Sequence, residues 1–278
     1  EMGVQSRDGA PLPIRWACGH AVGEGMEGVV RGPVSNRSHA RDVGLLSRAW
    51  HRALATVVLA IVVGVLLAFY LHTVGLVANV PASSDFAKFY LSAQYLRQGA
   101  DIYAPMDRNV VATLGGEIPE ELVVLHPNLN PPFFSVLLVP LTLLSYGQAF
   151  RLWSLAALAA GIAGALLTES MTRVGPLQPW RVLGFLAALL AFFPTWASVL
   201  LGQVSLFLLL ALVLVWRWTR SGHDGAAGVV LGVAAGVKLF VALPIAYFLL
   251  RRRWRVAASA AVAGTATVVI GLIFAGPD

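Results

Sequence analysis

The sequence predicts an all-α protein whose helices form a bundle that crosses a lipid bilayer several times. Of its 278 residues, 58% are hydrophobic and only 12% are charged, whereas soluble domains carry roughly 25% charged residues. The mean hydropathy is +0.74, and the apolar residues come in blocks of about 15–25, the length that a helix needs to cross the hydrocarbon. Because these blocks lack the period-two alternation of membrane barrels, they predict helices.

The remaining composition narrows the function classes. The net charge is +6, and the arginines lie beside apolar segments, so membrane topology explains them better than a nucleic-acid partner does. Cys18 is the only cysteine, so no intrachain disulfide can form. The sequence contains no P-loop, GxGxxG, Gly-x-Ser-x-Gly or metal-ligand motif, which argues against a nucleotide-driven pump or a Rossmann enzyme. We therefore expect no metal and no cofactor.

The N-terminal part, residues 1–48, is rich in Gly, Arg and Ser and predicts a disordered tail. Residues 49–278 then form the membrane domain, which we expect to be C-terminally truncated because the sequence ends directly after an apolar run. The first span is predicted at residues 53–77. The arginines that lead into it place the tail in the cytoplasm of a cell-membrane protein; they are Arg31, Arg37, Arg41, Arg48 and Arg52.

A polar stretch, residues 79–130, follows the first span and contains six acids against three basic residues. Such a balance is expected of an extracytoplasmic loop. Ser84 and Asp85 predict a helix start, and apolar residues then recur at helical spacing until Gly99. We expect an amphipathic helix lying at the membrane surface. A second short helix is predicted at residues 106–114.

The later apolar segments leave the topology open. They are predicted at residues 132–145, 149–168, 182–201, 204–218, 225–237 and 239–250, with a last run to residue 274. The arginines near residue 220 and at 251–255 both favour the cytoplasm. This requires a hairpin over residues 225–250, with Lys238 at its extracytoplasmic tip, and an odd number of crossings between residues 130 and 217. Four apolar segments lie in that region, which is an even number. The number of crossings becomes odd if the segment at 132–145 enters the membrane and returns to the same side.

Two charged residues are the strongest candidates for chemistry. Asp85 follows the first span and is a candidate general base at the mouth of a membrane cavity, although it could simply cap a helix. Lys238 has a long apolar run on each side, where an ionisable side chain is costly and therefore suggests function. It would pair with an anion such as a phosphate, unless it only snorkels from a helix end.

Further polar candidates interrupt or precede apolar runs. His126 opens the stretch His-Pro-Asn-Leu-Asn-Pro-Pro, which contains Asn130, and its simpler interpretation is a solvated loop residue. Gln203 follows Gly202, whose simpler role is close helix packing. Our predicted substrate-binding residues are Lys238, Tyr90, His126, Asn130 and Gln203.

Four motifs, taken in order, resemble glycosyltransferase family 87. They are Ser84-Asp85-Phe86 with Gly99-Ala100-Asp101-Ile102-Tyr103, Asn128-Leu129-Asn130-Pro131-Pro132-Phe133, Leu201-Gly202-Gln203 and Gly236-Val237-Lys238. The resemblance implies a bundle of the C-type glycosyltransferase kind. It also implies transfer of mannose, with inversion, from a polyprenyl-phosphate donor to a lipid or glycan acceptor on the extracytoplasmic face. Asp85 matches the family's proposed catalytic base, and Lys238 would neutralise the donor phosphate.

Two rival hypotheses remain beside this resemblance. One is a membrane transporter or lipid flippase that uses Asp85 and Lys238 in a translocation path. The break near Lys238 is compatible with it, but the halves show no convincing repeat, which such proteins often have. The other is a truncated, inactive membrane scaffold.

Overall fold

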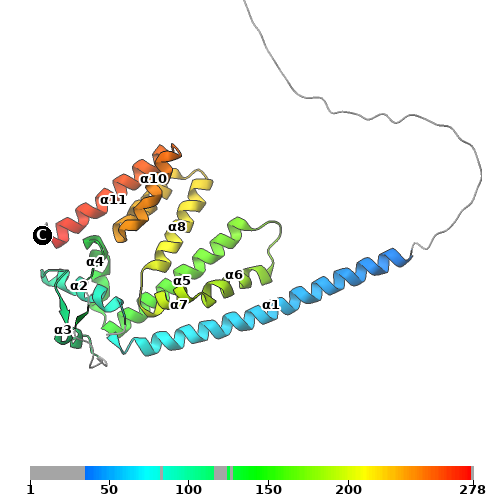
Figure 1. Ribbon diagram of the computed structural model, residues 1–278, viewed down its shortest axis with the longest axis horizontal. Coiled ribbons are helices and arrows are strands. Elements are labelled where there is room, and N and C mark those ends of the chain that lie inside the picture. Colours follow the sequence, from blue (N-terminus) through cyan, green and yellow to red (C-terminus); the bar gives the residue numbers. More distant parts are fainter. Residues whose placement is uncertain (1–34, 82–83, 116–123, 126–127, 277–278) are drawn as a thin grey trace, which may run out of the picture. The chain divides into compact units, whose positions relative to one another are not determined.

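The computed structural model describes residues 35–81, 84–115, 124–125 and 128–276, and the side chains of 48–81, 84–115 and 128–276. These residues are almost entirely helical (Figure 1), which confirms the all-α class. Within the described residues, the exception is a short antiparallel pair of β1 (Met106–Asp107) with β2 (Val124–Leu125). The chain divides into two units after Ser47, and the second, Arg48–Asp278, carries the contacts that define the fold.

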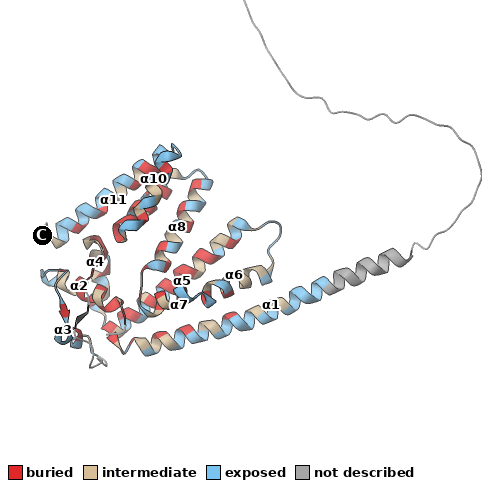
Figure 2. Ribbon diagram, viewed as in Figure 1, coloured by how far each residue is buried: buried red, intermediate tan, exposed pale blue. Residues whose placement is uncertain are grey.

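The first span is α1 (Ser35–Val77). Its part from Arg48 to Val77 is long and apolar enough to cross a membrane, and Figure 2 shows exposed residues along it. Because α1 begins at Ser35, residues 35–48 of the predicted tail are helical. No proline interrupts residues 35–77, and each residue added to an existing helix gains a hydrogen bond. Residues 1–34 of the predicted tail lie outside the described residues.

The helix predicted in the first loop is present as α2 (Phe86–Gln98). Its apolar face, however, packs against protein. The ring of Phe86 lies 5.9 Å from that of Phe150, and the ring of Phe89 lies 5.0 Å from that of Phe134. Among the polar residues of α2, the Ser92 hydroxyl is buried and donates to the Ile102 carbonyl at 2.6 Å. The apolar face of α2 is therefore buried against the bundle, and its placement at the membrane surface stays a prediction.

The residues after α2 fold back over it. α3 (Arg108–Ala112) lies where a second short helix is predicted. Asp107 caps it, since its carboxylate accepts the Val110 N–H at 2.9 Å. Leu91 of α2 packs with Met106 and Val111 in a small separate apolar cluster. This cluster covers the face of α2 that points away from the main core.

The segment formed by α4 (Pro132–Leu138) and η2 (Val139–Leu143) returns to the end of the bundle at which it starts. Pro131 lies beside Asp85 in one pocket. The next helix, α5 (Tyr146–Thr172), also begins there, because the Tyr146 ring lies 5.9 Å from the ring of Phe86. The segment therefore starts and ends at one end of the bundle, which is compatible with the entering and returning segment that the sequence left as one option.

The predicted segment 182–201 consists of two helices rather than one. α6 (Pro179–Ala191) and α7 (Phe193–Leu200) meet at Phe192 with a bend of 60°. Pro194 stands in the first turn of α7. Because proline has no N–H and restricts the residue before it, a continuous helix through this point is disfavoured.

The last part contains the predicted hairpin. α8 (Ser205–Arg220) leads to α9 (Asp224–Val237), and η3 (Leu239–Ala242) and α10 (Leu243–Leu250) return after Lys238. At the opposite end, Arg253 donates to the Thr219 carbonyl at 2.8 Å and lies 3.3 Å from the Asp224 carboxylate. Both arginine-containing turns therefore lie at one end and Lys238 at the other. Between the end with the arginine-containing turns and the end with Lys238 lie α5, the α6–α7 pair and α8, which is compatible with the odd number of crossings that the predicted hairpin requires.

α9 is fixed against α11 (Trp254–Ala275) by glycines spaced four residues apart. A Cβ atom added at Gly232 would lie 2.3 Å from the Ala260 carbonyl oxygen, and one at Gly236 would lie 2.1 Å from the Thr267 hydroxyl. Small residues at this spacing let membrane helices approach closely. The position of Lys238, directly after α9, therefore depends on this contact.

Replacement of Gly232 by Ala should separate α9 from α11 and lower the melting temperature of the purified protein. The obstructing atom is a backbone oxygen that cannot rotate away, so we expect a loss of about 1–3 kcal/mol, as for an overpacked core. Gly225→Ala is the matched control, because it lies in the same helix with nothing within 4 Å of the added atom. Equal melting temperatures for the two variants would contradict the role of the glycine contact.

Candidate functional site

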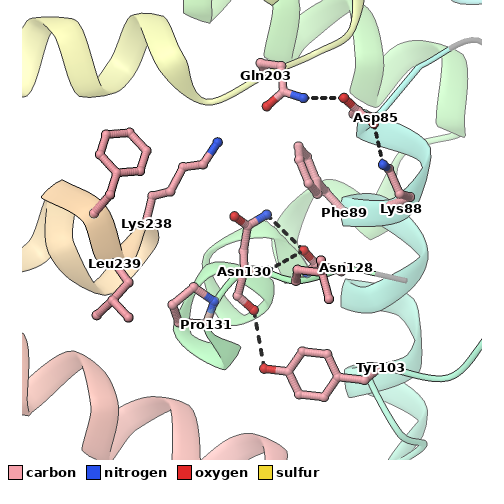
Figure 3. Close-up of a pocket in the computed structure, with 12 residues that line it drawn as sticks. Asp85, Lys88, Phe89, Tyr103, Asn128, Asn130, Pro131, Gln203, Lys238 and Leu239 are labelled. Carbon is pink, nitrogen blue, oxygen red and sulfur yellow. Dashed lines mark hydrogen bonds and ion pairs between the residues drawn. The ribbon is translucent and has the colours of Figure 1, made fainter. Parts of the chain in front are cut away.

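A cavity of about 670 Å³ lies at the end of the bundle where α2, α4, α8 and the α9–η3 break meet. Its polar and charged lining comes from Asp85, Lys88, Tyr103, Asn128, Asn130, Gln203 and Lys238. Figure 3 shows these side chains arranged around the cavity. Helix ends and breaks from four distant parts of the chain therefore build one site.

Asp85 occupies the N-cap position directly before α2 but does not cap the helix with its side chain. Instead, the Ser84 hydroxyl caps the helix, because it accepts the Phe86 N–H at 3.0 Å. The Asp85 carboxylate pairs through one oxygen with the amine of Lys88, and its other oxygen accepts a hydrogen bond from the Gln203 amide (Figure 3). At 27% exposure it is partly open to the cavity, so the carboxylate serves the site rather than the helix terminus.

The turn that carries Gln203 is docked on the start of α2. The Phe86 N–H donates to the Leu201 carbonyl at 3.1 Å, and the Trp153 indole N–H donates to the Gly202 carbonyl at 2.7 Å. Gly202 has a φ of +65°, and a Cβ atom there would lie 2.5 Å from the Phe86 Cβ. Glycine is therefore required twice, for the left-handed backbone and for the close approach.

Replacement of Gly202 by Ala should lower the melting temperature more than replacement of Gly99 by Ala. Gly99 has nearly the same φ of +68° but nothing within 4 Å of an added Cβ, so both variants carry a backbone cost of about 1–2 kcal/mol. Only Gly202→Ala adds the clash with Phe86, worth about a further 1–3 kcal/mol. If thermal unfolding finds the two variants equally stable, the docked turn is not as close as described.

The start of α4 is fixed by two asparagines. Asn128 is only 1% exposed, and its Oδ1 accepts both the backbone N–H and the side-chain amide of Asn130, at 3.0 and 2.9 Å. The Tyr103 hydroxyl donates to the Asn130 carbonyl at 3.3 Å. Burial raises the pKa of the Tyr103 phenol, and the negative charge of Asp101 raises it further, so the hydroxyl stays a donor at neutral pH. These contacts present the Asn130 side chain to the cavity.

Lys238 reaches the cavity from the break between α9 and η3, where its backbone is extended. Its amine lies 5.7 Å from the centroid of the Phe240 ring. Figure 3 shows the side chain extended into the space between this break and the side that carries Gln203. Among the described residues, no carboxylate lies within ion-pair distance of the amine. Its positive charge is therefore available to an anion.

The structure brings together four of the predicted site residues, namely Asp85, Asn130, Gln203 and Lys238. It does not bring Tyr90 to the cavity. Tyr90 is only 4% exposed, and its hydroxyl donates to the Leu144 carbonyl at 2.7 Å. His126 lies outside the described residues.

Three polar residues of the cavity were missed by the sequence analysis. Lys88 carried a usable signal, because a basic residue three positions after Asp85 falls on the same side of a helix. The sequence carries no signal for Asn128 and Tyr103 beyond their place in the motifs, because both residues act through hydrogen bonds with Asn130. Within the described ranges, no group of three or more His, Cys, Asp or Glu side chains could hold a metal ion.

Fold and site together define a helical membrane protein with a polar pocket at one end of its bundle, containing a carboxylate and an available ammonium group. The model of glycosyltransferase family 87 matches residues 128–278. The chain belongs to this family, which confirms the resemblance seen in its motifs. Asn130, Gln203 and Lys238 lie inside the matched region, whereas Asp85 precedes it.

Two curated relatives carry the name polyprenol-phosphate-mannose-dependent alpha-(1-2)-phosphatidylinositol pentamannoside mannosyltransferase. The protein of Mycolicibacterium smegmatis is 32% identical over 159 residues, which is 54% of this chain and 36% of the relative. The protein of Mycobacterium tuberculosis is 31% identical over 157 residues, which is 55% of this chain and 35% of the relative. The chain thus matches about a third of the length of these relatives. No solved structure shows significant similarity to it.

Proposed function

We propose that the chain is the part of a membrane mannosyltransferase that holds the catalytic carboxylate and the donor phosphate. The donor would be a polyprenyl-phosphate mannose and the acceptor a lipid or glycan. One observation carries the proposal, namely that Asp85 and Lys238, distant in sequence, line the same cavity. The names of the relatives, which specify dependence on polyprenol-phosphate mannose, support the choice of donor.

In the proposed reaction, a hydroxyl oxygen of the acceptor attacks the anomeric carbon of mannose on the face opposite the phosphate. The Asp85 carboxylate takes the proton of that hydroxyl. The bond between the anomeric carbon and the phosphate oxygen breaks, and its electron pair leaves with the polyprenyl phosphate. Attack opposite the leaving group inverts the anomeric configuration. Each carboxylate oxygen can accept more than one hydrogen bond, so the contacts with Lys88 and Gln203 orient Asp85 without blocking it.

Charge and hydrogen bonding would be supplied by the rest of the lining. Negative charge grows on the phosphate as the bond breaks, and a fixed ammonium group stabilises such charge most strongly where water is excluded. Lys238 is placed for this, because no described carboxylate neutralises it. Asn130 donates its amide N–H to Asn128, which leaves its side-chain oxygen as an acceptor for a sugar hydroxyl.

We further propose that the cavity faces the extracytoplasmic side and the N-terminal tail the cytoplasm. Gln203 and Arg220 stand before and at the end of α8, a helix of 16 residues or about 24 Å. The cavity and the arginine-containing turns therefore lie far apart along the bundle. Short basic turns are retained on the cytoplasmic side.

The test is incubation of the full-length protein in sealed liposomes with polyprenyl-phosphate mannose and candidate lipid acceptors. We expect a mannosylated acceptor with inverted configuration. A membrane-impermeant mannosidase should remove the added sugar only where the cavity end faces outward. Movement of the donor across the bilayer without any product would favour the flippase hypothesis, and neither activity would favour the inactive scaffold.

A further inference from the structure

A second cavity, of about 480 Å³, lies between α8 and α10 at the end of the bundle opposite Asp85. Its wall is apolar and includes Leu212, Val215 and Phe248. Arginine side chains stand at its rim, together with Trp216 and Tyr247. The cavity therefore combines a long apolar wall with a cationic edge, and neither part takes a role in the transfer reaction.

The charge at this rim is only partly neutralised. Arg253 is occupied, since it donates to the Thr219 carbonyl and pairs with Asp224 at 3.3 Å. Arg220 lies over the Trp216 ring at 5.7 Å from its centroid. Within the part of the chain that the structure describes, neither Arg220 nor Arg251 has a carboxylate partner. Two guanidinium groups are thus available for an anion.

The apolar wall continues onto surface that faces outward. Leu243 is 73% exposed and Leu250 is 84% exposed on α10, and Tyr247 between them is 57% exposed. A membrane helix exposes such residues to lipid, and Trp and Tyr are enriched where lipid meets water. An acyl chain can therefore enter the cavity from the side, while its head group stays beside the arginines.

We propose that this cavity binds an anionic phospholipid, with the phosphate held by Arg220 and Arg251 and an acyl chain along Leu212. Guanidinium groups bind phosphate through paired hydrogen bonds, and basic pockets between membrane helices suit anionic head groups. The proposal is independent of the transfer reaction, because it uses none of the residues around Asp85.

The test uses the full-length protein in neutral detergent, mixed with phosphatidylglycerol or phosphatidylcholine, and native mass spectrometry to count retained lipid. Arg220→Gln and Arg251→Gln should each lower retained phosphatidylglycerol about fivefold, the order expected for one basic residue at an anionic surface. Retention of phosphatidylcholine should not change. Arg252→Gln is the matched control, because it removes the same charge from the same turn but Arg252 does not line the cavity.

Two results would overturn the proposal. An equal loss in Arg252→Gln would mean that retention follows net charge rather than this cavity. Unchanged retention in Leu212→Gln, together with displacement of the lipid by inorganic phosphate, would mean that the arginines take phosphate without an acyl chain. Leu212→Gln keeps every arginine, so it also gives a result if the arginine variants do not fold. Melting curves identify any variant that has unfolded.

Discussion

Replacement of Asp85 by Asn should abolish mannose transfer while the protein stays folded. Asn has the same shape and can still accept the hydrogen bond from Gln203, but it cannot take the proton of the acceptor hydroxyl. Removal of a general base costs about 10²- to 10⁴-fold in rate. Initial rates with polyprenyl-phosphate mannose, measured on protein of unchanged melting temperature, check this expectation.

Asp101→Asn is the matched control for this variant. Asp101 is an exposed carboxylate of the same loop that accepts the Tyr103 N–H at 2.8 Å and does not line the cavity. Its side-chain oxygen is preserved in Asn, so transfer should proceed at the normal rate. If Asp85→Asn keeps more than about a tenth of the rate, well short of the loss that a missing base causes, then Asp85 is not the base.

Replacement of Lys238 by Ala should weaken use of the donor. Loss of one group that stabilises developing charge costs about 10²- to 10³-fold, and here we expect it in kcat/KM for the polyprenyl-phosphate donor. Lys238→Arg keeps the positive charge at the same break in the helix and should recover part of the loss. Steady-state kinetics with varied donor concentration give kcat/KM for the Lys238→Ala and Lys238→Arg variants.

The variant Lys88→Ala distinguishes the role of Lys88 from that of Lys238, the other lysine of the cavity. Lys88 pairs with Asp85, so its loss should lower kcat and leave the KM for the donor unchanged. An unchanged kcat/KM for the donor in Lys238→Ala would remove Lys238 from the phosphate site and leave the donor phosphate without an assigned cation.

The features that the sequence predicted well depend on local signals. The start of α2 follows a capping pattern, and the hairpin over residues 225–250 follows from one lysine flanked by apolar runs and two basic turns. The break at Gly202 and Gln203 interrupts an otherwise continuous apolar run. Each of these signals lies within a few residues of the feature that it predicts.

The features that were missed depend on contacts between distant residues. Asp85 and Gln203 are 118 positions apart, so no local pattern shows that an amide orients the carboxylate. Tyr90 shares the apolar face of α2, and only the packing of η2 and α5 decides that it is buried away from the cavity. The bend at Phe192 is different, because Pro194 is a local signal for it that stands two residues away.

The length of α9 has a consequence for where the chemistry takes place. α9 has 14 residues, or about 21 Å of helix, against a hydrocarbon layer about 30 Å thick. If Asp224 lies at one boundary of that layer, Lys238 stops well short of the other. Either the bilayer thins around the hairpin or a water-filled recess reaches down to the lysine, and in both cases a lipid-carried phosphate would have to sink below the plane of the surrounding head groups to meet it.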